Sequence, residues 1–438
     1  MIGEVLHPSN MMRACRQAVL NKGCAGVDGM KVDGLHAYFR TNRKRIGDSL
    51  RHGRYLPQPV LGVEIPKPDG RKRLLGVPVV IDRMLQQAVG QVLSNHYDAG
   101  FSEYSYGFRP NRNALQAVQR SLAYINEGND WIVDMDLKNF FDEADHCVLL
   151  QILYRKVKCV RTLRLIRKWL RSPVQLNGKL VKRRKGMPQG SPLSPILSNI
   201  LLNGLDKELG RMGVKHIRYA DDFSLCFKDE SEARHAGNRI CLCLRDKLHL
   251  GINREKSGIR RPEGFTVPGY GFEVAPAATS GGKHRLVASA KSLKTMKQKL
   301  KGITRKTRPF SFDTRVRMLG EVQRGWLQYF CLARMYWQVD KLDKWVRSRL
   351  RHCIRHAWKK PERRRKNLLR LGVKPSNARS WSRTRMGGWA TARSPILKTT
   401  ITIARLQKRG YKAMLPLYQS IAPYLNEPLY TRPVRTVV

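Results

Sequence analysis

Residues 217–225 have the sequence Ile217-Arg218-Tyr219-Ala220-Asp221-Asp222-Phe223-Ser224-Leu225, in which two adjacent carboxylates interrupt an apolar stretch. The pattern over residues 216–227 predicts a β-hairpin with Asp221 and Asp222 at its bend. Most aspartate pairs in turns do no more than reverse the chain. Two carboxylates this close repel each other unless a cation neutralises them, so a metal site is the alternative interpretation.

A second acidic stretch lies upstream, where residues 131–137 are Trp-Ile-Val-Asp-Met-Asp-Leu. The apolar character predicts a buried strand, and side chains that alternate along a strand place Asp134 and Asp136 on one face. Carboxylate oxygens are ligands for Mg²⁺, which also shares the phosphates of its substrates. Two such ions can stabilise both the attacking and the leaving oxygen of a phosphoryl transfer.

The charge of the chain is strongly positive. Its 438 residues, at roughly 100–200 per domain, predict two to four domains, and 42% apolar residues exclude wholesale disorder. Lys and Arg number 84 against 33 Asp and Glu, a formal net charge of +51. Residues 281–438 hold 39 of these cations and six acids, a net +33. A domain this cationic favours a polyanionic partner, with nucleic acid the first candidate and an anionic membrane the second.

Other features argue against the membrane. The longest uncharged stretch, residues 186–205, contains Pro188, Pro192 and Pro195, so we predict no transmembrane segment. Nine cysteines occur without a Cys-x-x-Cys pair, and the N-terminus has no signal-peptide pattern. These features predict reduced thiols in a reducing compartment.

Periodicity predicts a change of architecture near residue 280. Before it, we expect a helix within residues 1–22, hairpins at 60–80 and around Asn177-Gly178, and helices at 81–95, 114–125 and 194–209. After it, apolar residues recur every three or four positions over 293–303, 319–330 and 339–354, which is typical of helices.

Three stretches, in this order along the chain, resemble motifs of reverse transcriptases. Residues 136–142 resemble the first metal-binding motif, residues 186–195 the motif that contacts template and nucleotide, and residues 219–222 the catalytic box. Within that superfamily the chain resembles the bacterial group II intron reverse transcriptase/maturases. The stretches that carry this closer resemblance are 26–29, 65–70, 75–78, 82–83, 105–110, 253–257, 269–272 and 325–330.

The resemblance implies a right-hand polymerase of α/β (α+β) fingers and palm, followed by an all-α thumb and a small basic C-terminal region. We expect an N-terminal extension and fingers over 1–130, a palm over 131–280 with a fingers-like insertion at about 143–185, a thumb (maturase domain) over 281–375, and a basic nucleic-acid-binding region over 376–438. No cysteine follows Cys353, so we expect the compact type that lacks the family's metal-dependent endonuclease.

The resemblance also implies a set of site residues. Asp136, Asp221 and Asp222, with the carbonyl of Leu137, would hold two Mg²⁺ ions, for which Mn²⁺ could substitute. Lys256 would act on the leaving pyrophosphate. The residues expected to bind the nucleotide are Lys67, Arg73, Phe141 and Gln189. Those expected to bind template or primer are Gly23, Ala25, Gly26, Val27, Asp28, Gly29, Arg109, Gly190, Tyr270 and Gly271.

Some of these residues have simpler explanations. Phe141, which would exclude a 2′-hydroxyl, could equally be a core residue, and Lys256 a solvated lysine at a helix end. Trp326, Tyr329 and Phe330 have helical spacing and are expected in the thumb core.

The implied function is RNA-directed DNA synthesis from dNTPs, with an RNA template, a DNA primer, a cognate intron RNA whose splicing the chain assists, and target DNA. No membrane partner is expected, and the location would be the bacterial cytoplasm or nucleoid. Two alternatives stay open: a related reverse transcriptase with a host role in repair or defence, and an RNA-binding splicing factor that needs no polymerase activity.

Overall fold

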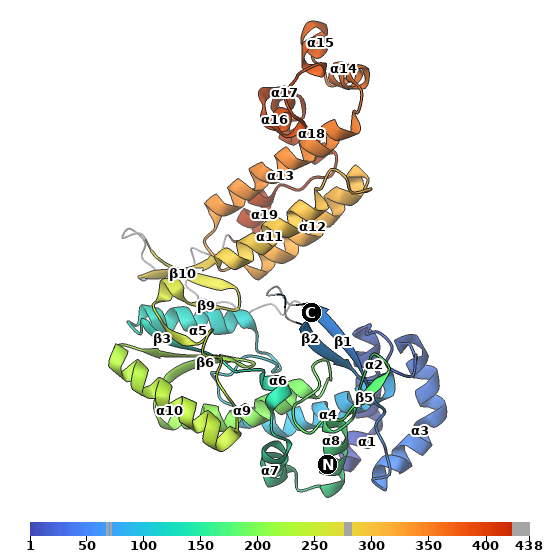
Figure 1. Ribbon diagram of the computed structural model, residues 1–438, viewed down its shortest axis with the longest axis vertical. Helices are drawn as coiled ribbons and strands as arrows, with labels where there is room; N and C mark the ends of the chain where they lie inside the picture. The colour runs from blue at the N-terminus through green and yellow to red at the C-terminus, as the bar shows by residue number, and fades with distance from the viewer. Residues whose placement is uncertain (67–69, 71, 276–282, 423–438) are drawn as a thin grey trace. The chain divides into compact units, whose positions relative to one another are not determined.

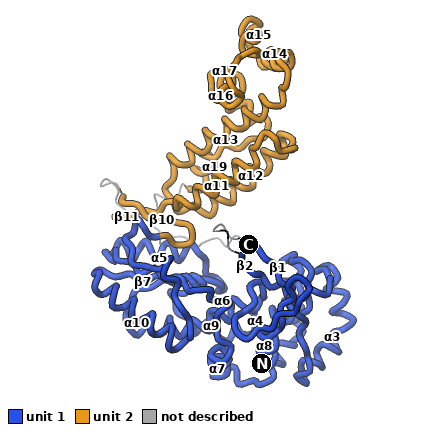
Figure 2. Tube along the Cα trace, in the orientation of Figure 1, with its two compact units in different colours: residues 1–265 blue, residues 266–438 orange. Residues whose placement is uncertain are grey.

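Two four-stranded sheets organise the first 265 residues. In a computed structural model, residues 1–66, 70, 72–275 and 283–422 are described, and the chain divides into a first unit, residues 1–265, and a second unit, residues 266–438 (Figures 1 and 2). The first unit mixes helices and strands, and the second is mainly helical (Figure 1). The predicted change from mixed to helical structure is confirmed.

One sheet of the first unit has the strand order β6-β7-β3-β8, with antiparallel neighbours throughout. Its strands are β3 (Trp131–Asp136), β6 (Lys215–Tyr219), β7 (Asp222–Phe227) and β8 (Gly258–Arg260). The register sets Asp136 opposite Asp222, and Asp222 opposite Tyr219. The two acidic stretches therefore meet at one end of this sheet.

The other sheet has the order β2-β1-β4-β5. Its strands are β1 (Val60–Pro66), β2 (Lys72–Val77), β4 (Val174–Leu176) and β5 (Lys179–Val181). Both predicted hairpins are present, since β1 pairs with β2 and β4 with β5 in antiparallel register. Asn177 and Gly178 have φ angles of 50° and 80°, the left-handed conformation that a tight two-residue turn requires.

The helices of the first unit enclose a continuous apolar core, in which α4 and α9 are the most deeply buried. They are α1 (Ile2–Leu6), α2 (Pro8–Leu20), α3 (Leu35–Arg51), α4 (Val80–Tyr97), α5 (Ala114–Asn126), α6 (Phe140–Glu143), α7 (His146–Val157), α8 (Val160–Leu170), α9 (Ser194–Arg211) and α10 (Glu230–Leu248), with short 3₁₀ turns η1 (Val32–Gly34), η2 (Asp98–Gly100) and η3 (Pro262–Gly264). The expected single helix within residues 1–22 is two helices, because Pro8 starts a new one at its first position.

The second unit begins with a small antiparallel sheet and continues as packed helices. Its elements are β9 (Thr266–Val267), β10 (Tyr270–Val274), β11 (His284–Ala288), α11 (Ala290–Ile303), α12 (Phe312–Tyr329), α13 (Tyr336–Ala357), α14 (Pro361–Arg370), α15 (Pro375–Ser382), α16 (Gly388–Arg393), α17 (Pro395–Thr400), α18 (Ile403–Lys408) and α19 (Met414–Ile421).

The last described helices pack back onto the long helix α13. The buried Tyr411 donates a hydrogen bond from its hydroxyl to Asp343 Oδ1 (2.6 Å), and Tyr418 donates to the carbonyl of Ala333 (2.8 Å). Helix α16 also packs against α13, and α19 packs against both α12 and α13. Removal of residues 376–438 would therefore expose part of this helical core, so binding by this segment has to be tested with point substitutions.

Across the described residues, the helices lack the combination of length and apolar character needed to cross a bilayer.

Candidate active site

Three carboxylates come together where the β6-β7-β3-β8 sheet ends. Asp136 is the last residue of β3, and Asp222 is the first residue of β7 directly opposite it. Asp221 lies in the turn between β6 and β7. We predicted both acids at the bend, but Asp222 belongs to the strand, and its place in the register brings it next to Asp136.

The electrostatics of these acids disfavour their ionised forms in the absence of a neighbouring cation. Burial raises the pKa of Asp221 above its usual range, and the charge of Asp136 raises it further. The pKa of Asp222 rises to about 7, first through burial and then through the charges of Asp221, Asp136 and Asp134. A group of acids with raised pKa values is a common feature of functional sites.

The loop at residues 252–257 positions Asp136. Asn253 Nδ2 donates to Asp136 Oδ2 (3.0 Å), and the Asp136 amide donates to Ser257 Oγ (2.9 Å). Lys256 Nζ lies 3.3 Å from the same Asp136 oxygen. The predicted catalytic lysine is thus beside the acids, while Asp134 pairs with Arg260 at 3.2 Å.

The three acids fit divalent ions that arrive together with a phosphate-bearing substrate. In the described part of the chain, no group of three or more His, Cys, Asp or Glu side chains is already arranged as a metal-binding cluster. Mg²⁺ is usually held by only one or two carboxylates, and substrate phosphates and water complete its shell. Asp136, Asp221 and Asp222 can supply the one or two carboxylate ligands that each such ion needs, and a cation among them relieves their mutual repulsion. Leu137, the residue after Asp136, forms an isolated antiparallel β-bridge with Ile252.

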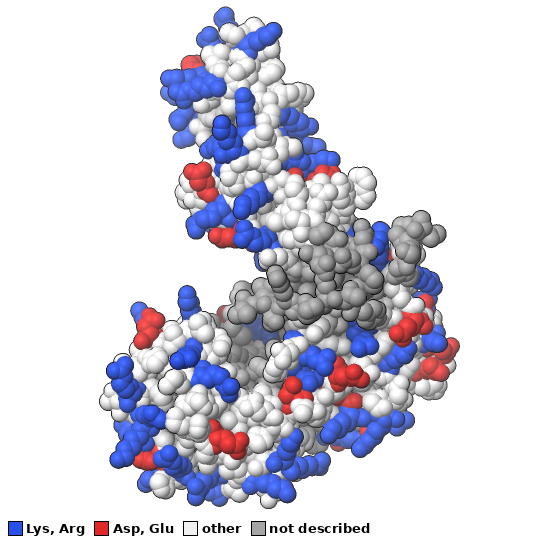
Figure 3. Space-filling view, turned by 180° about the vertical axis from the view of Figure 1, so that it is seen from behind, with Lys and Arg blue, Asp and Glu red and all other residues white. Residues whose placement is uncertain are grey.

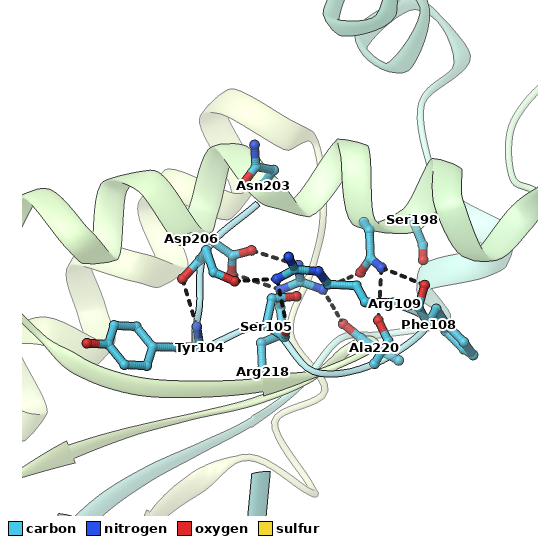
Figure 4. Close-up of polar contacts among 12 residues, drawn as sticks. Tyr104, Ser105, Phe108, Arg109, Ser198, Asn203, Asp206, Arg218 and Ala220 are labelled. Carbon is cyan, nitrogen blue, oxygen red and sulfur yellow. Dashed lines mark hydrogen bonds and ion pairs between the residues drawn. The ribbon is translucent and has the colours of Figure 1, made fainter. Parts of the chain in front are cut away.

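A buried ion pair between Arg218 and Asp206 lies next to Ala220, the residue that precedes Asp221 in the chain (Figure 4). The Arg218 side chain is fully buried, and its Nε and Nη2 donate to the two carboxylate oxygens of Asp206 at 2.8 and 2.6 Å. Its Nη1 donates to Asn199 Oδ1 (2.9 Å) and to the Ala220 carbonyl (2.8 Å). One guanidinium therefore joins α9 to the residue directly before Asp221 and Asp222.

The same contacts hold Ala220 in an unfavourable backbone conformation. Its φ angle is 59°, in the left-handed region that alanine rarely adopts. Residues 104–107 pack against it: Asn199 Nδ2 donates to the Gly107 carbonyl (2.9 Å), and a Cβ on Gly107 would lie 2.2 Å from the Ala220 nitrogen. Only glycine therefore fits at position 107. The contacts around Ala220 hold it in this conformation, which would otherwise be unfavourable.

Sequence reasoning missed this network. One signal was available, since Arg218 is a charged residue between Ile217 and Tyr219, directly before the two adjacent acids. Asn199 and Asp206 are seven residues apart, which places them on one face of a helix.

The side chain of Arg109, expected to bind template or primer, makes an ion pair and hydrogen bonds with residues of the first unit. Its Nε lies 2.7 Å from Asp98 Oδ1, its Nη1 donates to the carbonyls of Ser102 and Ser105, and its side chain is 6% exposed. These contacts fix the loop that packs against Ala220.

Two of the residues predicted to bind the nucleotide, Arg73 and Gln189, contact each other. Arg73 Nε donates to Gln189 Oε1, and the Gly76 amide donates to the Gln189 carbonyl (2.7 Å), which links β2 to the loop before α9. Phe141 is partly buried, and its ring centroid lies 5.2 Å from that of Phe140. Lys67 lies outside the described residues.

The loop before α9, which contains Gly186 and Gly190, packs closely against the backbone of Phe141 and Asp142. Gly186 has a φ angle of 84°, and a Cβ there would lie 2.6 Å from the Asp142 carbonyl oxygen, so glycine is required. Gly190, the expected template contact, has a φ angle of 113° in the same loop.

The loop over residues 23–29, expected to bind template or primer, lies against α4. Arg83 Nη2 donates to the carbonyl of Cys24, and Gly26 is buried. Asp28 Oδ1 accepts the Met30 amide at 3.2 Å, and the Gly26 carbonyl accepts the Gly29 amide at 3.2 Å. Ala25 and Val27 are half-buried in this loop, as is Gly23.

The predicted primer grip belongs to the second unit. Tyr270 is fully buried, and its hydroxyl donates to the Tyr329 carbonyl. Gly271 pairs with Val287 of β11. Phe330 lies in the same aromatic cluster and is buried, as expected, whereas Tyr329 is 38% exposed.

Comparison with known proteins agrees with this geometry. Residues 65–272 match the family model described as reverse transcriptase (RNA-dependent DNA polymerase), and residues 293–372 match the group II intron maturase-specific domain. The first match contains all three acids, and the second covers α12 and α13.

Individual relatives point the same way. The chain is 35% identical over 218 residues to the group II intron-encoded protein LtrA of Lactococcus lactis subsp. cremoris, a match that covers 49% of this chain and 36% of that protein. It is 29% identical over 307 residues to protein YkfC of Escherichia coli K12, covering 61% of this chain and 81% of YkfC. The chain thus spans about a third of the length of LtrA.

A solved Cas6-RT-Cas1–Cas2 complex contains a chain that aligns with 56% of this chain and 42% of its own length, with 22% identity and a TM-score of 0.36. That similarity is too low to bear on function.

Proposed function

We propose that this chain, which belongs to the family of group II intron-encoded reverse transcriptases and maturases, is an RNA-directed DNA polymerase that also binds an intron RNA and assists its splicing. The single observation that best supports the polymerase is the pairing of Asp136 with Asp222 across the sheet, with Asp221 beside them. The maturase role rests on the domain matched over residues 293–372.

In this proposal, Asp136, Asp221 and Asp222, with the Leu137 carbonyl, hold two Mg²⁺ ions, and Mn²⁺ is able to substitute. Such ions would supply the positive charge that a phosphoryl transfer needs as negative charge develops on its oxygens. The primer 3′-hydroxyl attacks the α-phosphorus of a dNTP, a new phosphorus–oxygen bond forms, and the bond to pyrophosphate breaks.

The chain's own residues position the reactants. Lys256, 3.3 Å from Asp136 Oδ2, supplies a proton or a positive charge to the departing pyrophosphate. Arg73 and Gln189, which already contact each other, bind the triphosphate and the nucleotide. Phe141 lies under the sugar and leaves no room for a 2′-hydroxyl. The loop at 252–257 keeps Asp136 oriented through Asn253 and Ser257.

We assign the polymerase subdomains accordingly. Fingers with an N-terminal extension occupy 1–130, the palm 131–280 with an insertion at about 143–185, the thumb 281–375, and the basic nucleic-acid-binding region 376–438. The loop from Gly23 to Lys31 acts as a lid over the template strand, and Tyr270 and Gly271 grip the primer. The partners are RNA template, intron RNA, DNA primer, target DNA and dNTPs, in the bacterial cytoplasm or nucleoid.

Primer extension tests this proposal. The purified chain should add dNTPs to a DNA primer on an RNA template in Mg²⁺, and EDTA should abolish the reaction. Asp136→Asn should be inactive, whereas Asp246→Asn, the same change at an exposed carboxylate on α10, should match the parent. Absence of Mg²⁺-dependent extension by the folded parent would reject the proposed activity.

A further inference from the structure

A cleft of about 990 Å³ lies in the second unit, between α13 and the three short helices α16, α17 and α18. We call it the α13 cleft. Its size is at the upper end of ordinary ligand sites, roughly 300–1,000 Å³, which is sufficient for nucleotides. Six cationic side chains line it, with no acidic residue in its lining: Lys341, Lys344, Arg347, Arg351, Arg393 and Lys398.

Three of these cations already have structural partners. Lys344 lies 2.7 Å from Asp340, and Arg347 lies 3.1 Å from Asp343. Arg351 donates from Nε to the carbonyl of Ile401 (2.9 Å), which ties α13 to the end of α17. The first two pairs lie within α13, so of these three residues only Arg351 joins the two walls of the cleft.

The other three cations are available for a ligand. Lys341, Arg393 and Lys398 are exposed, and within the described residues no carboxylate forms an ion pair with any of them. The wall made by α16–α18 belongs to a stretch with no acid at all between Glu362 and Glu427. The field in the cleft is therefore positive from both sides. In Figure 3, Lys and Arg likewise outnumber Asp and Glu on the visible face of the helical unit.

Two indole rings share the cleft with these cations. Trp345 and Trp389 both line it, and both are only partly buried. Trp389 lies 5.8 Å from the His352 ring, and Trp345 is flanked by Arg349 at 5.0 Å. Cations that contact phosphates and aromatic rings that stack on bases are the combination that binds single-stranded nucleic acid.

We propose that the α13 cleft binds an unpaired stretch of RNA, with Lys341, Arg393 and Lys398 contacting phosphates and Trp389 stacking on a base. The inference deepens the proposed function, since it locates a binding site for RNA in the maturase part of the chain. A duplex hides the faces of its bases, so unpaired nucleotides are the better ligand for exposed indoles. An acidic peptide or an anionic lipid would gain little from the two rings.

Charge neutralisation tests the phosphate contacts. The cleft variant is the full chain with Lys341→Gln, Arg393→Gln and Lys398→Gln. The matched control is Arg363→Gln, Lys366→Gln and Arg370→Gln on α14, three exposed cations of the same unit away from the cleft. Binding of a single-stranded RNA oligonucleotide is measured at several salt concentrations. At ~0.7 per contact on a single strand, the cleft variant should lower the slope of log K against log salt by up to about 2, and the control by less.

Trp389→Leu tests the stacking without changing charge. We expect affinity for single-stranded RNA to fall roughly tenfold or more with an unchanged salt slope, and affinity for an RNA duplex of equal length to change little. Equal losses in the cleft and α14 variants would overturn the proposal, because they would indicate a diffuse charge effect. Equal binding of polyglutamate in competition would overturn it as well.

Primer extension by the same preparations separates the two proposals. A chain that binds RNA through the cleft but does not extend a primer would contradict only the proposed polymerase. A chain that extends a primer while both the cleft variant and Trp389→Leu bind RNA like the parent would contradict only the cleft.

Discussion

The two units use charged side chains in opposite ways. In the first unit, the charged residues around the three acids have defined partners: Arg218 is fully buried against Asp206, and Lys256 lies beside Asp136. In the second, Lys and Arg outnumber Asp and Glu by 39 to six over residues 281–438, and many remain exposed (Figure 3). Phosphoryl transfer depends on the positions of a few groups, whereas attraction of a polyanion depends on the number of cations. Substitutions in the first unit should therefore act steeply on rate, and those in the second should act gradually on affinity.

The largest effect on stability is expected at the buried pair. Arg218→Gln leaves Asp206 buried without its cation, so the free energy of unfolding should fall by about 3–5 kcal/mol. Arg260→Gln is the control, because its partner Asp134 lies in a more exposed pair, and the loss there should stay below about 1 kcal/mol. Denaturant unfolding of the two variants measures the difference. Similar losses would mean that burial does not distinguish these pairs.

A double variant of the Arg218–Asp206 pair separates its effect on stability from its effect on the position of Ala220. Arg218→Met combined with Asp206→Leu removes both charges, and such replacements often restore stability. The Ala220 carbonyl would still lack the donor that holds it, so the rate of nucleotide incorporation should stay low even when unfolding resembles that of the parent. If both the stability and the rate of nucleotide incorporation recovered fully, the pair would contribute to stability and not to the position of Ala220.

A smaller effect, on selectivity, is expected at Phe141. Phe141→Val should make room for a 2′-hydroxyl and lower the ratio of kcat/KM for dGTP over GTP by about tenfold or more. Phe140→Leu, a change at the buried neighbour, should cost stability and leave the ratio unchanged. A ratio that does not move in Phe141→Val would make Phe141 a core residue only.

The smallest effect concerns Asp222 in metal-free protein. Its pKa is raised to about 7 from an unfolded value near 3.8, so the ionised carboxylate destabilises the fold. That cost is absent below the unfolded pKa and complete once the pH has risen through the folded pKa. Asp222→Asn in EDTA should therefore raise the melting temperature slightly at pH 8 and not at pH 4, with solvent screening keeping the gain small. A gain of equal size at both pH values would contradict this cause.

The same contrast explains what could be read from the sequence. The hairpin at 216–227, the strand at 131–136 and the three acids carry local patterns, so residue order alone predicts them. The Arg218 network was missed, because its contacts join Gly107, helix α9 and the turn at Ala220 through tertiary packing that residue order does not display. Arg109 matches a motif, yet its contact with Asp98 is a tertiary feature. In the second unit, helix spacing was predictable, but the packing of Tyr411 and Tyr418 onto earlier helices was not.

The central claim is that chemistry and nucleic-acid affinity reside in separate sets of residues. The most direct test is the rate of single-nucleotide incorporation by Asp221→Asn with Asp222→Asn at saturating primer–template, with RNA affinity measured on the same preparation. We predict that incorporation falls by at least about a hundredfold, while RNA affinity stays within about twofold of the parent, because binding depends on the cations. Clear residual synthesis by the double variant, or a loss of RNA affinity that accounts for the loss of rate, would contradict the account.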